Sequence, residues 1–282
     1  MAKILTAGSA VMDIIHTVNH YPQEDEEIRA LEKREAVGGN SVNTAVVLGK
    51  LGHQCGWMGS LADDLAAGFI KGKLTEYRID YSLAAVYPGQ SPVSVITLNQ
   101  GNGSRTIIHY RTLPELQLEE KFKKTDFGIY DWIHLEGRNI AVTLALVEIM
   151  KKFPVKISVE IEKPRGGEEA LFPFADVLVF GKSYLAAKGS DHPEDYMKEL
   201  RKKVSADIVC PWGEQGAWGM SGESIIHIPA YRPERIVDTI GAGDAFNAGL
   251  VDGYVNGLDF SEIVTRAVHI AGKKCGTEGF AL

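Results

Sequence analysis

The residues best suited to chemistry lie in one short stretch, the string DTIGAGDAFN at 238–247. Gly241 and Gly243 let the backbone turn tightly and let another molecule approach it closely. Small and apolar residues follow, so the turn leads into a helix whose first amides lack partners within the helix. Those amides and the helix dipole favour an anion such as phosphate. We therefore predict an anion-binding turn at this place.

A carboxylate at Asp244, inside such a turn, is unexpected because it repels phosphate. A general base beside a transferring phosphoryl group would explain its presence. The same residues also fit a plain glycine-rich turn, since Asp is favoured near the start of any helix. The stretch lacks the Lys-Ser/Thr pair of the Walker sequence, and it does not fit the dinucleotide fingerprint.

Polar residues nearer the N-terminus are suited to binding hydroxyl groups. Asp13 is a lone charge among apolar neighbours, so it either caps backbone amides in a turn or binds ligand hydroxyls at a strand end. Asn40 and Asn43 follow Gly38 and Gly39 and are three residues apart, hence neighbours on one helical face. Each amide offers a donor and an acceptor, as recognition of a polyol requires. The alternative is an N-cap followed by a surface Asn.

Regular elements must hold these residues in place. From residue 131 onward the pattern alternates between strands and helices, which indicates parallel βα units. Ligands of such sheets bind at the carboxyl ends of the strands. The expected strands are 155–160, 176–180 and 208–211, the expected helices are 63–77, 141–152 and 260–274, and hairpins are expected at 91–111 and 219–228.

The charge-dense segment 24–35 has two readings. Its periodicity favours a solvated helix with Ile28 and Leu31 on one face. The other reading is an extended strand of a lid. A family resemblance, described below, favours the strand.

Size and composition limit the class of protein. The 282 residues suit one large domain, or one domain with a small accessory. A net charge of -7 argues against nucleic acid as a partner, and no apolar run approaches the roughly 20 residues that cross a bilayer. Cys55, Cys210 and Cys275 form neither a metal pattern nor a disulfide framework. With no signal-peptide core at the start, we expect a cytoplasmic protein.

The string D-T-x-G-A-G-D-x-F resembles a signature of the ribokinase-like (PfkB-type) carbohydrate kinases, and G-G-N-x-x-N-x-A at 38–45 resembles the other. The resemblance covers about 11–280 and is strongest to the ketohexokinase (fructokinase) group, through strings such as HLEGRN at 134–139 and EIEKPR at 160–165. It implies an α/β fold, a Rossmann-like three-layer α/β/α sandwich with a mostly parallel sheet. The whole chain, 1–282, would be one domain with a discontinuous β-sheet lid formed by about 14–37 and 91–112.

Carried over by position, the resemblance makes Asp244 the general base and the amides of the turn the anion hole. The catalytic group would be Asp244, Gly241, Ala242 and Gly243. The sugar and phosphates would contact Asp13, Gly39, Asn40, Asn43, Arg105 and Asp244, although a single Arg on a strand is more often a plain surface residue. ATP would lie against Trp212, Gly213, Gly216, Gly243 and Gly272.

One departure concerns the metal. Many members carry Asn-x-x-Glu near the metal and phosphates, where this chain reads GKSY at 181–184. The protein ligands of Mg²⁺ are therefore left unassigned.

The expected activity is that of an ATP- and Mg²⁺-dependent sugar kinase that phosphorylates a ketose such as fructose. A kinase for another small sugar, a polyol or a nucleoside is the alternative in the same class. A non-catalytic sugar- or nucleotide-binding regulator belongs to a different class, and the presence of Asp244 argues against it. A small lid with exposed edges also predicts a homodimer that forms through the lids.

Overall fold

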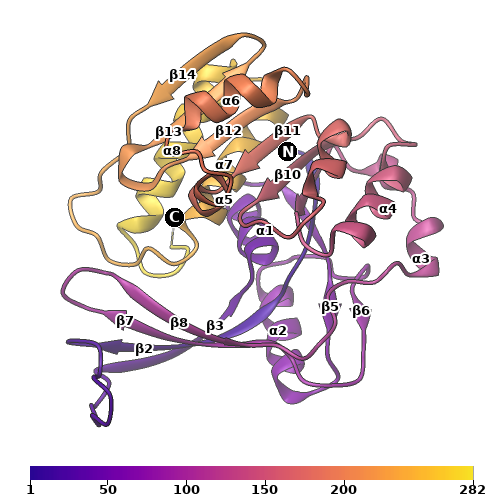
Figure 1. Ribbon diagram of the computed structural model, residues 1–282. Coiled ribbons are helices and arrows are strands. Elements are labelled where there is room, and N and C mark those ends of the chain that lie inside the picture. Colours follow the sequence, from indigo (N-terminus) through magenta and orange to yellow (C-terminus); the bar gives the residue numbers. More distant parts are fainter. Residues whose placement is uncertain (282) are drawn as a thin grey trace.

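The computed structural model describes residues 1–281, and its largest feature is an eight-stranded sheet (Figure 1). The strand order is β14 (Ser224–Ile228), β13 (Ala217–Ser221), β12 (Asp207–Pro211), β11 (Val177–Phe180), β10 (Lys156–Ile161), β9 (Trp132–Glu136), β1 (Lys3–Ala7) and β4 (Gln54–Met58). The strands from β12 to β4 pair in parallel, and β13 and β14 add an antiparallel hairpin at one edge. The mostly parallel sheet predicted from the alternating pattern is confirmed.

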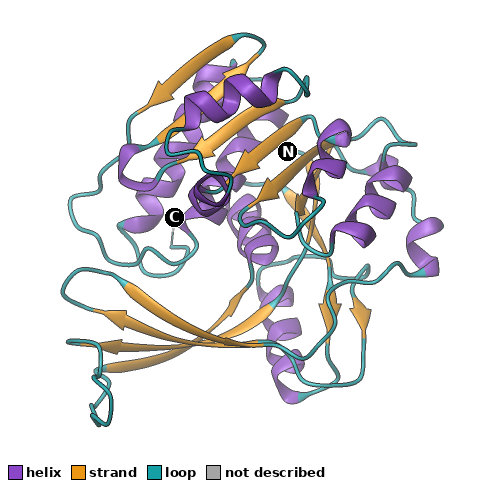
Figure 2. Cartoon of the chain, in the orientation of Figure 1, coloured by secondary structure: helices purple, strands orange, loops and turns teal. Residues whose placement is uncertain are grey.

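Helices cover both faces of this sheet and complete three layers (Figure 2). One face carries α1 (Asn40–Lys50), α2 (Leu65–Glu76), α7 (Ala242–Val255) and α8 (Phe260–Cys275); the other carries α4 (Ile140–Met150), α5 (Lys182–Ala187) and α6 (Pro193–Arg201). Successive strand residues serve opposite faces, so Ile4 packs with the first group and Leu5 with the second. Because both faces are covered, the central strands are buried along most of their length.

The minor elements lie in the connections. The short helix α3 (Glu120–Lys123) precedes β9, and β5 (Ser60–Leu61) pairs in parallel with β6 (Ala85–Val86). Three 3₁₀ turns span Phe127–Ile129, Glu168–Phe174 and Gly213–Gln215. No helix within residues 1–281 combines the length and the apolar character needed to span a bilayer.

A separate four-stranded sheet lies beside the main body, in the order β3 (Glu32–Gly38), β2 (Val11–Val18), β7 (Val93–Asn99) and β8 (Arg105–Tyr110). We call it the small sheet. The predicted hairpin at 91–111 is its β7–β8 pair. Ile15, Ile96 and Leu98 form a small buried cluster in it, and Ile240 from the segment before α7 packs against them. The small sheet therefore faces the turn that the sequence marked as chemically important (Figure 1).

The helical reading of 24–35 is wrong. Residues 24–25 form a turn, 26–31 have no regular structure, and β3 begins at Glu32. The backbone is extended because β3 pairs with β2 from Thr17–Glu32 to Val11–Gly38. Pairing along the ladder outweighs the local helical pattern here.

Candidate active site

The glycine turn, residues 238–244, ends the loop that follows β14 and leads into α7. Gly241 is the N-cap of α7 and has φ 76°, a left-handed conformation that favours glycine. No side chain caps this helix, and a Cβ at Gly243 would meet open space. Among residues 1–281, no group accepts a hydrogen bond from the amides of Gly243 or Asp244. Free amides at a helix start with open space beside them are suited to an anion.

Asp244 is buried in the first turn of α7, and its carboxylate accepts a hydrogen bond of 2.7 Å from Asn43 Nδ2. Burial raises the pKa of Asp244 well above its usual range, and the nearby charge of Glu160 raises it further. The hydrogen bond from Asn43 partly opposes this shift. A carboxylate with a raised pKa holds an accepted proton more readily, as a general base requires.

Asn40 and Asn43 both face the site, as predicted from their spacing. Asn40 begins α1, and its Nδ2 donates to Glu160 Oε2 at 3.2 Å, while Asn43 reaches Asp244 from the next turn. Thr44 Oγ1 donates to the carbonyl of Asp244 at 3.3 Å and so links α1 to α7. Two helix starts are thereby held together.

Gly39 allows α1 to begin at this place. It is the N-cap of α1 with φ 99°, and a Cβ there would collide with the carbonyl of Ser9. Glycine is thus required twice over, by backbone conformation and by close approach.

Asp13 lies within β2 rather than in a turn, which removes the capping alternative. It is buried, and burial raises the pKa of its carboxyl group to about 6, against a hydrogen bond from Ser94 and the charge of Arg34. A Cβ at Gly38 would collide with this carboxylate. Gly38 therefore makes room for Asp13, a role that the sequence did not indicate.

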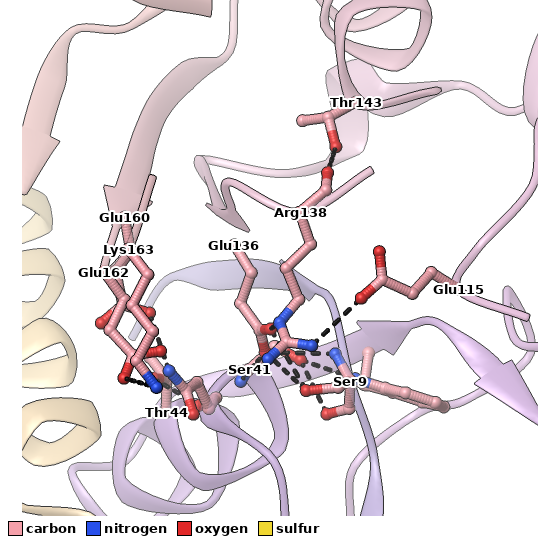
Figure 3. Close-up of polar contacts among 12 residues, drawn as sticks. Ser9, Ser41, Thr44, Glu115, Glu136, Arg138, Thr143, Glu160, Glu162 and Lys163 are labelled. Atoms are coloured by element: carbon pink, nitrogen blue, oxygen red, sulfur yellow. Dashed lines mark hydrogen bonds and ion pairs between the residues drawn. The ribbon is translucent and has the colours of Figure 1, made fainter. Parts of the chain in front are cut away.

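Glu160 belongs to a group of carboxylates at the ends of β9 and β10. Burial raises the pKa of Glu160 to about 7, and the charges of Glu136 and Glu162 add to the shift. Glu136 accepts hydrogen bonds from Ser9 N at 3.1 Å and Ser41 N at 2.7 Å, and it pairs with Arg138 at 2.9 Å (Figure 3). Glu136, at the end of β9, thus links the start of α1 to the loop that follows β1, and sequence reasoning did not single it out.

Arg105 reaches the glycine turn from the small sheet. Its Nη1 donates to Thr239 Oγ1 at 2.8 Å, and Thr239 Oγ1 donates to the carbonyl of Gly103 at 3.2 Å. The hairpin tip of β7 and β8 therefore lies against the turn, beside the predicted phosphate position.

Two further basic residues hold the turn through Asp238, and the sequence did not mark either of them. Arg34 Nη2 on β3 lies 2.8 Å from Asp238 Oδ2, and Lys274 Nζ on α8 lies 3.2 Å from the same atom. Lys274 Nζ also donates to the carbonyl of Asp238 at 2.7 Å. The side chains of Asp238 and Lys274 are both fully buried.

The residues predicted to bind ATP lie in a turn after β12 and on α8, and two of them, Gly216 and Gly272, pack closely against segment 228–231. Trp212 N donates to the carbonyl of Gly216 at 2.7 Å and closes a turn after β12, in which Gly213 has open space around it. Gly216 packs against the backbone of 228–230, and Gly272 of α8 packs against Tyr231. Both glycines allow segment 228–231 to approach closely.

Comparison with known proteins gives a family for this architecture. Residues 1–282, the whole chain, match the pfkB family of carbohydrate kinases. The chain is 36% identical to ketohexokinase from Mus musculus over 291 residues, which covers 99% of this chain and 97% of that protein.

Solved structures agree in fold. The ribokinase of Arabidopsis thaliana, complexed with ribose and ATP, has a TM-score of 0.80 at 21% identity and covers 99% of this chain and 94% of that one. The adenosine kinase of Sinorhizobium meliloti has a TM-score of 0.83 at 19% identity, with coverage of 99% and 95%. At these identities the likeness establishes the fold alone.

Proposed function

Because this chain belongs to the pfkB family of carbohydrate kinases, we propose that it transfers the γ-phosphate of ATP to a hydroxyl group of a ketose such as fructose. The observation that carries the proposal is the buried Asp244 at the open start of α7, held by Asn43. The identity of 36% to mouse ketohexokinase supports a ketose as the acceptor.

The reaction follows from the placement of these groups. The sugar lies between Asp13 on the small sheet and Asn40 and Asn43 on α1. Its hydroxyl gives a proton to Asp244 as the oxygen bonds to the γ-phosphorus, and the bond from γ-phosphorus to the bridging oxygen breaks. ADP leaves with the electron pair of that bond. The amides of Gly243 and Asp244 donate to the negative charge on the transferred group.

The carboxylates near the turn fit a magnesium ion. Oxygen ligands suit Mg²⁺, which keeps several waters and needs only one or two carboxylates together with substrate phosphates. Within residues 1–281 no group of three His, Cys, Asp or Glu side chains is placed to hold a metal ion. Burial raises the pKa of Glu160, the charges of Glu136 and Glu162 raise it further, and a bound cation would relieve the repulsion among these carboxylates. We propose that Glu160 and Glu162 hold Mg²⁺, which would neutralise charge on the phosphates.

The proposal is tested by incubating the protein with ATP, Mg²⁺ and a panel of ketoses, aldoses, polyols and nucleosides, and measuring ADP release. Fructose or another ketose is expected to give the highest kcat/KM. A higher kcat/KM for a nucleoside or an aldose would show that this compound class, and not the ketoses, contains the substrate. Binding of sugar and nucleotide with no transfer to any acceptor would identify a regulator instead.

The sugar-binding roles predict a selective loss of affinity. Asp13→Ala and Asn43→Ala should each weaken fructose binding by roughly 1–3 kcal/mol, because each leaves buried hydroxyl-binding groups unpaired. Calorimetric titration of fructose measures this loss, and titration of ADP should change little. Asn256→Ala, at the far end of α7, is the control. Unchanged fructose affinity with weakened ADP binding would reverse the assignment of the two sites.

The small sheet supports a homodimer. All six residues of β8 at its edge are exposed. Pairing of Val95 with Ile108 and of Val93 with Tyr110 puts these apolar side chains on the outer face. Ile107 pairs with Ile96, so it lies on the opposite face of β8 from Ile108 and Tyr110. We propose that two copies bury this outer face in an isologous contact.

Val95→Glu should therefore convert a dimer to a monomer, because it places a charge in the centre of the proposed contact. Light scattering at micromolar concentration measures the mass. Leu65→Glu, on the exposed start of α2, is a matched apolar-to-acidic control that should leave the mass unchanged. A wild-type monomer at the same concentration would rule the dimer out.

A further inference from the structure

The carboxyl ends of β10, β11 and β12 lie side by side, because these strands are parallel neighbours. In that order they lead into Glu162, Lys182 and Trp212. Ligands of open α/β sheets bind at this edge. Lys182 therefore lies between the carboxylates of the proposed magnesium site and the turn proposed for ATP.

Lys182 is a cation that the proposed reaction has not used. Its Nζ lies over the ring of Trp212, 5.4 Å from the ring centroid, and the residue is exposed. Lys163 and Lys188 pair with Glu162 and Glu169, whereas within residues 1–281 no carboxylate pairs with Lys182. Its positive charge is free to meet an anionic ligand.

Other cations near the glycine turn are already engaged. Lys274 is fully buried and pairs with Asp238, and Arg105 donates to Thr239. The carboxylate of Asp244, in the first turn of α7, would repel the phosphates of a nucleotide bound beside it. A further positive charge at this edge would oppose that repulsion.

We propose that Lys182 binds the phosphate chain of the nucleotide, with its ammonium group leaving the ring of Trp212 to reach the phosphates. The proposal rests on the proposed kinase function. A lysine ammonium is a compact point charge on a flexible stem and suits phosphate. Lys182 lies within 181–184, the stretch where many family members carry Asn-x-x-Glu, so this chain would supply a direct positive charge in place of that motif.

The test is titration of ATP, ADP and adenosine, each with Mg²⁺, into the wild-type protein and Lys182→Met. The variant should bind ATP and ADP about 10- to 100-fold more weakly, as expected for loss of a hydrogen bond to a charged group. Adenosine, which has no phosphate, should bind equally to both proteins. Lys182→Arg should restore most of the lost affinity because it keeps the charge.

Lys188→Met is a matched control. Lys188 also lies over an aromatic ring, that of Tyr184 at 5.2 Å, but it pairs with Glu169. Its loss should leave ATP and ADP affinity unchanged.

Equal ADP affinity in wild type and Lys182→Met would overturn the proposal. Lys182 would then only pack its side chain over the ring of Trp212. An equal loss for adenosine and ADP would overturn it as well, because the effect would then lie in the packing of Trp212. A wild-type protein that binds neither ATP nor ADP would refute the kinase function itself, which separates that failure from the failure of Lys182.

Discussion

Asp244→Asn is expected to lower kcat by about 10²–10⁴ while fructose affinity stays close to that of the wild type. The amide has nearly the shape of the carboxylate and can still accept the hydrogen bond from Asn43, but it cannot take the proton of the sugar hydroxyl. ADP release under saturating substrates measures kcat, and calorimetry measures fructose binding. Asp63→Asn, on the loop before α2, is a control that should leave both unchanged.

The pH profile gives a second readout for Asp244. The base acts in its ionised form, so activity falls as acid protonates it. Because its pKa is raised, the fall should begin at a higher pH than the ordinary Asp value of about 3.9 implies. Near-wild-type turnover in Asp244→Asn would show that Asp244 is not the general base. Glu160, with a pKa of about 7, would then be the first candidate to test by Glu160→Gln.

The sequence was most informative where the decisive interactions are local. The glycine turn needs only Gly241, Gly243 and the apolar run that follows, and the structure places the start of α7 there. Asn40 and Asn43 share a face because α1 has the helical period, and they reach Glu160 and Asp244 as a pair.

Residues whose roles depend on distant partners could not be found in this way. Lys274 follows Ile263, Ala267 and Ile270 at helical spacing, so periodicity alone places it on the buried face of α8. Its partner Asp238 is 36 residues away, and no local pattern pairs the two. A charged residue on an apolar helical face was the available signal.

The contact of Arg34 with Asp238 could not be predicted for a different reason. It lies in a charge-dense segment whose pattern resembles a solvated helix. In β3 it alternates with Glu35, and only pairing with β2 decides which of the two faces the site. Glu136 likewise follows an apolar strand, but its donors Ser9 and Ser41 belong to segments 127 and 95 residues away.

Asp238 is where these distant contacts converge on the glycine turn. One carboxylate oxygen accepts from Ile240 N at 2.8 Å, and the other meets Arg34, Lys274 and Gly279 N. The small sheet, α8 and the C-terminal segment are thereby joined to the turn whose amides we propose bind phosphate. We therefore expect this carboxylate to hold the conformation of the turn.

Asp238→Asn should therefore lower the free energy of unfolding by about 3–5 kcal/mol, because it leaves the ammonium of Lys274 buried without a counter-charge. Urea denaturation measures the loss. Lys274→Met should cost less, since Asp238 keeps Arg34 and two amide donors.

Combining Asp238→Asn with Lys274→Met should recover part of the stability lost in Asp238→Asn alone, because neither buried charge is then unpaired. The pH dependence provides an independent check. Burial lowers the pKa of Lys274, and Asp238 opposes that shift in the wild type. Without Asp238 the folded protein binds fewer protons than the unfolded chain below the ordinary lysine pKa of about 10.4, so the stability of Asp238→Asn should rise between about pH 7 and 10. If Asp238→Asn unfolds at the wild-type urea concentration with no such rise, the ion pair does not hold the turn, and the conformation of 238–244 must be fixed by the packing of Ile240 and Phe280 instead.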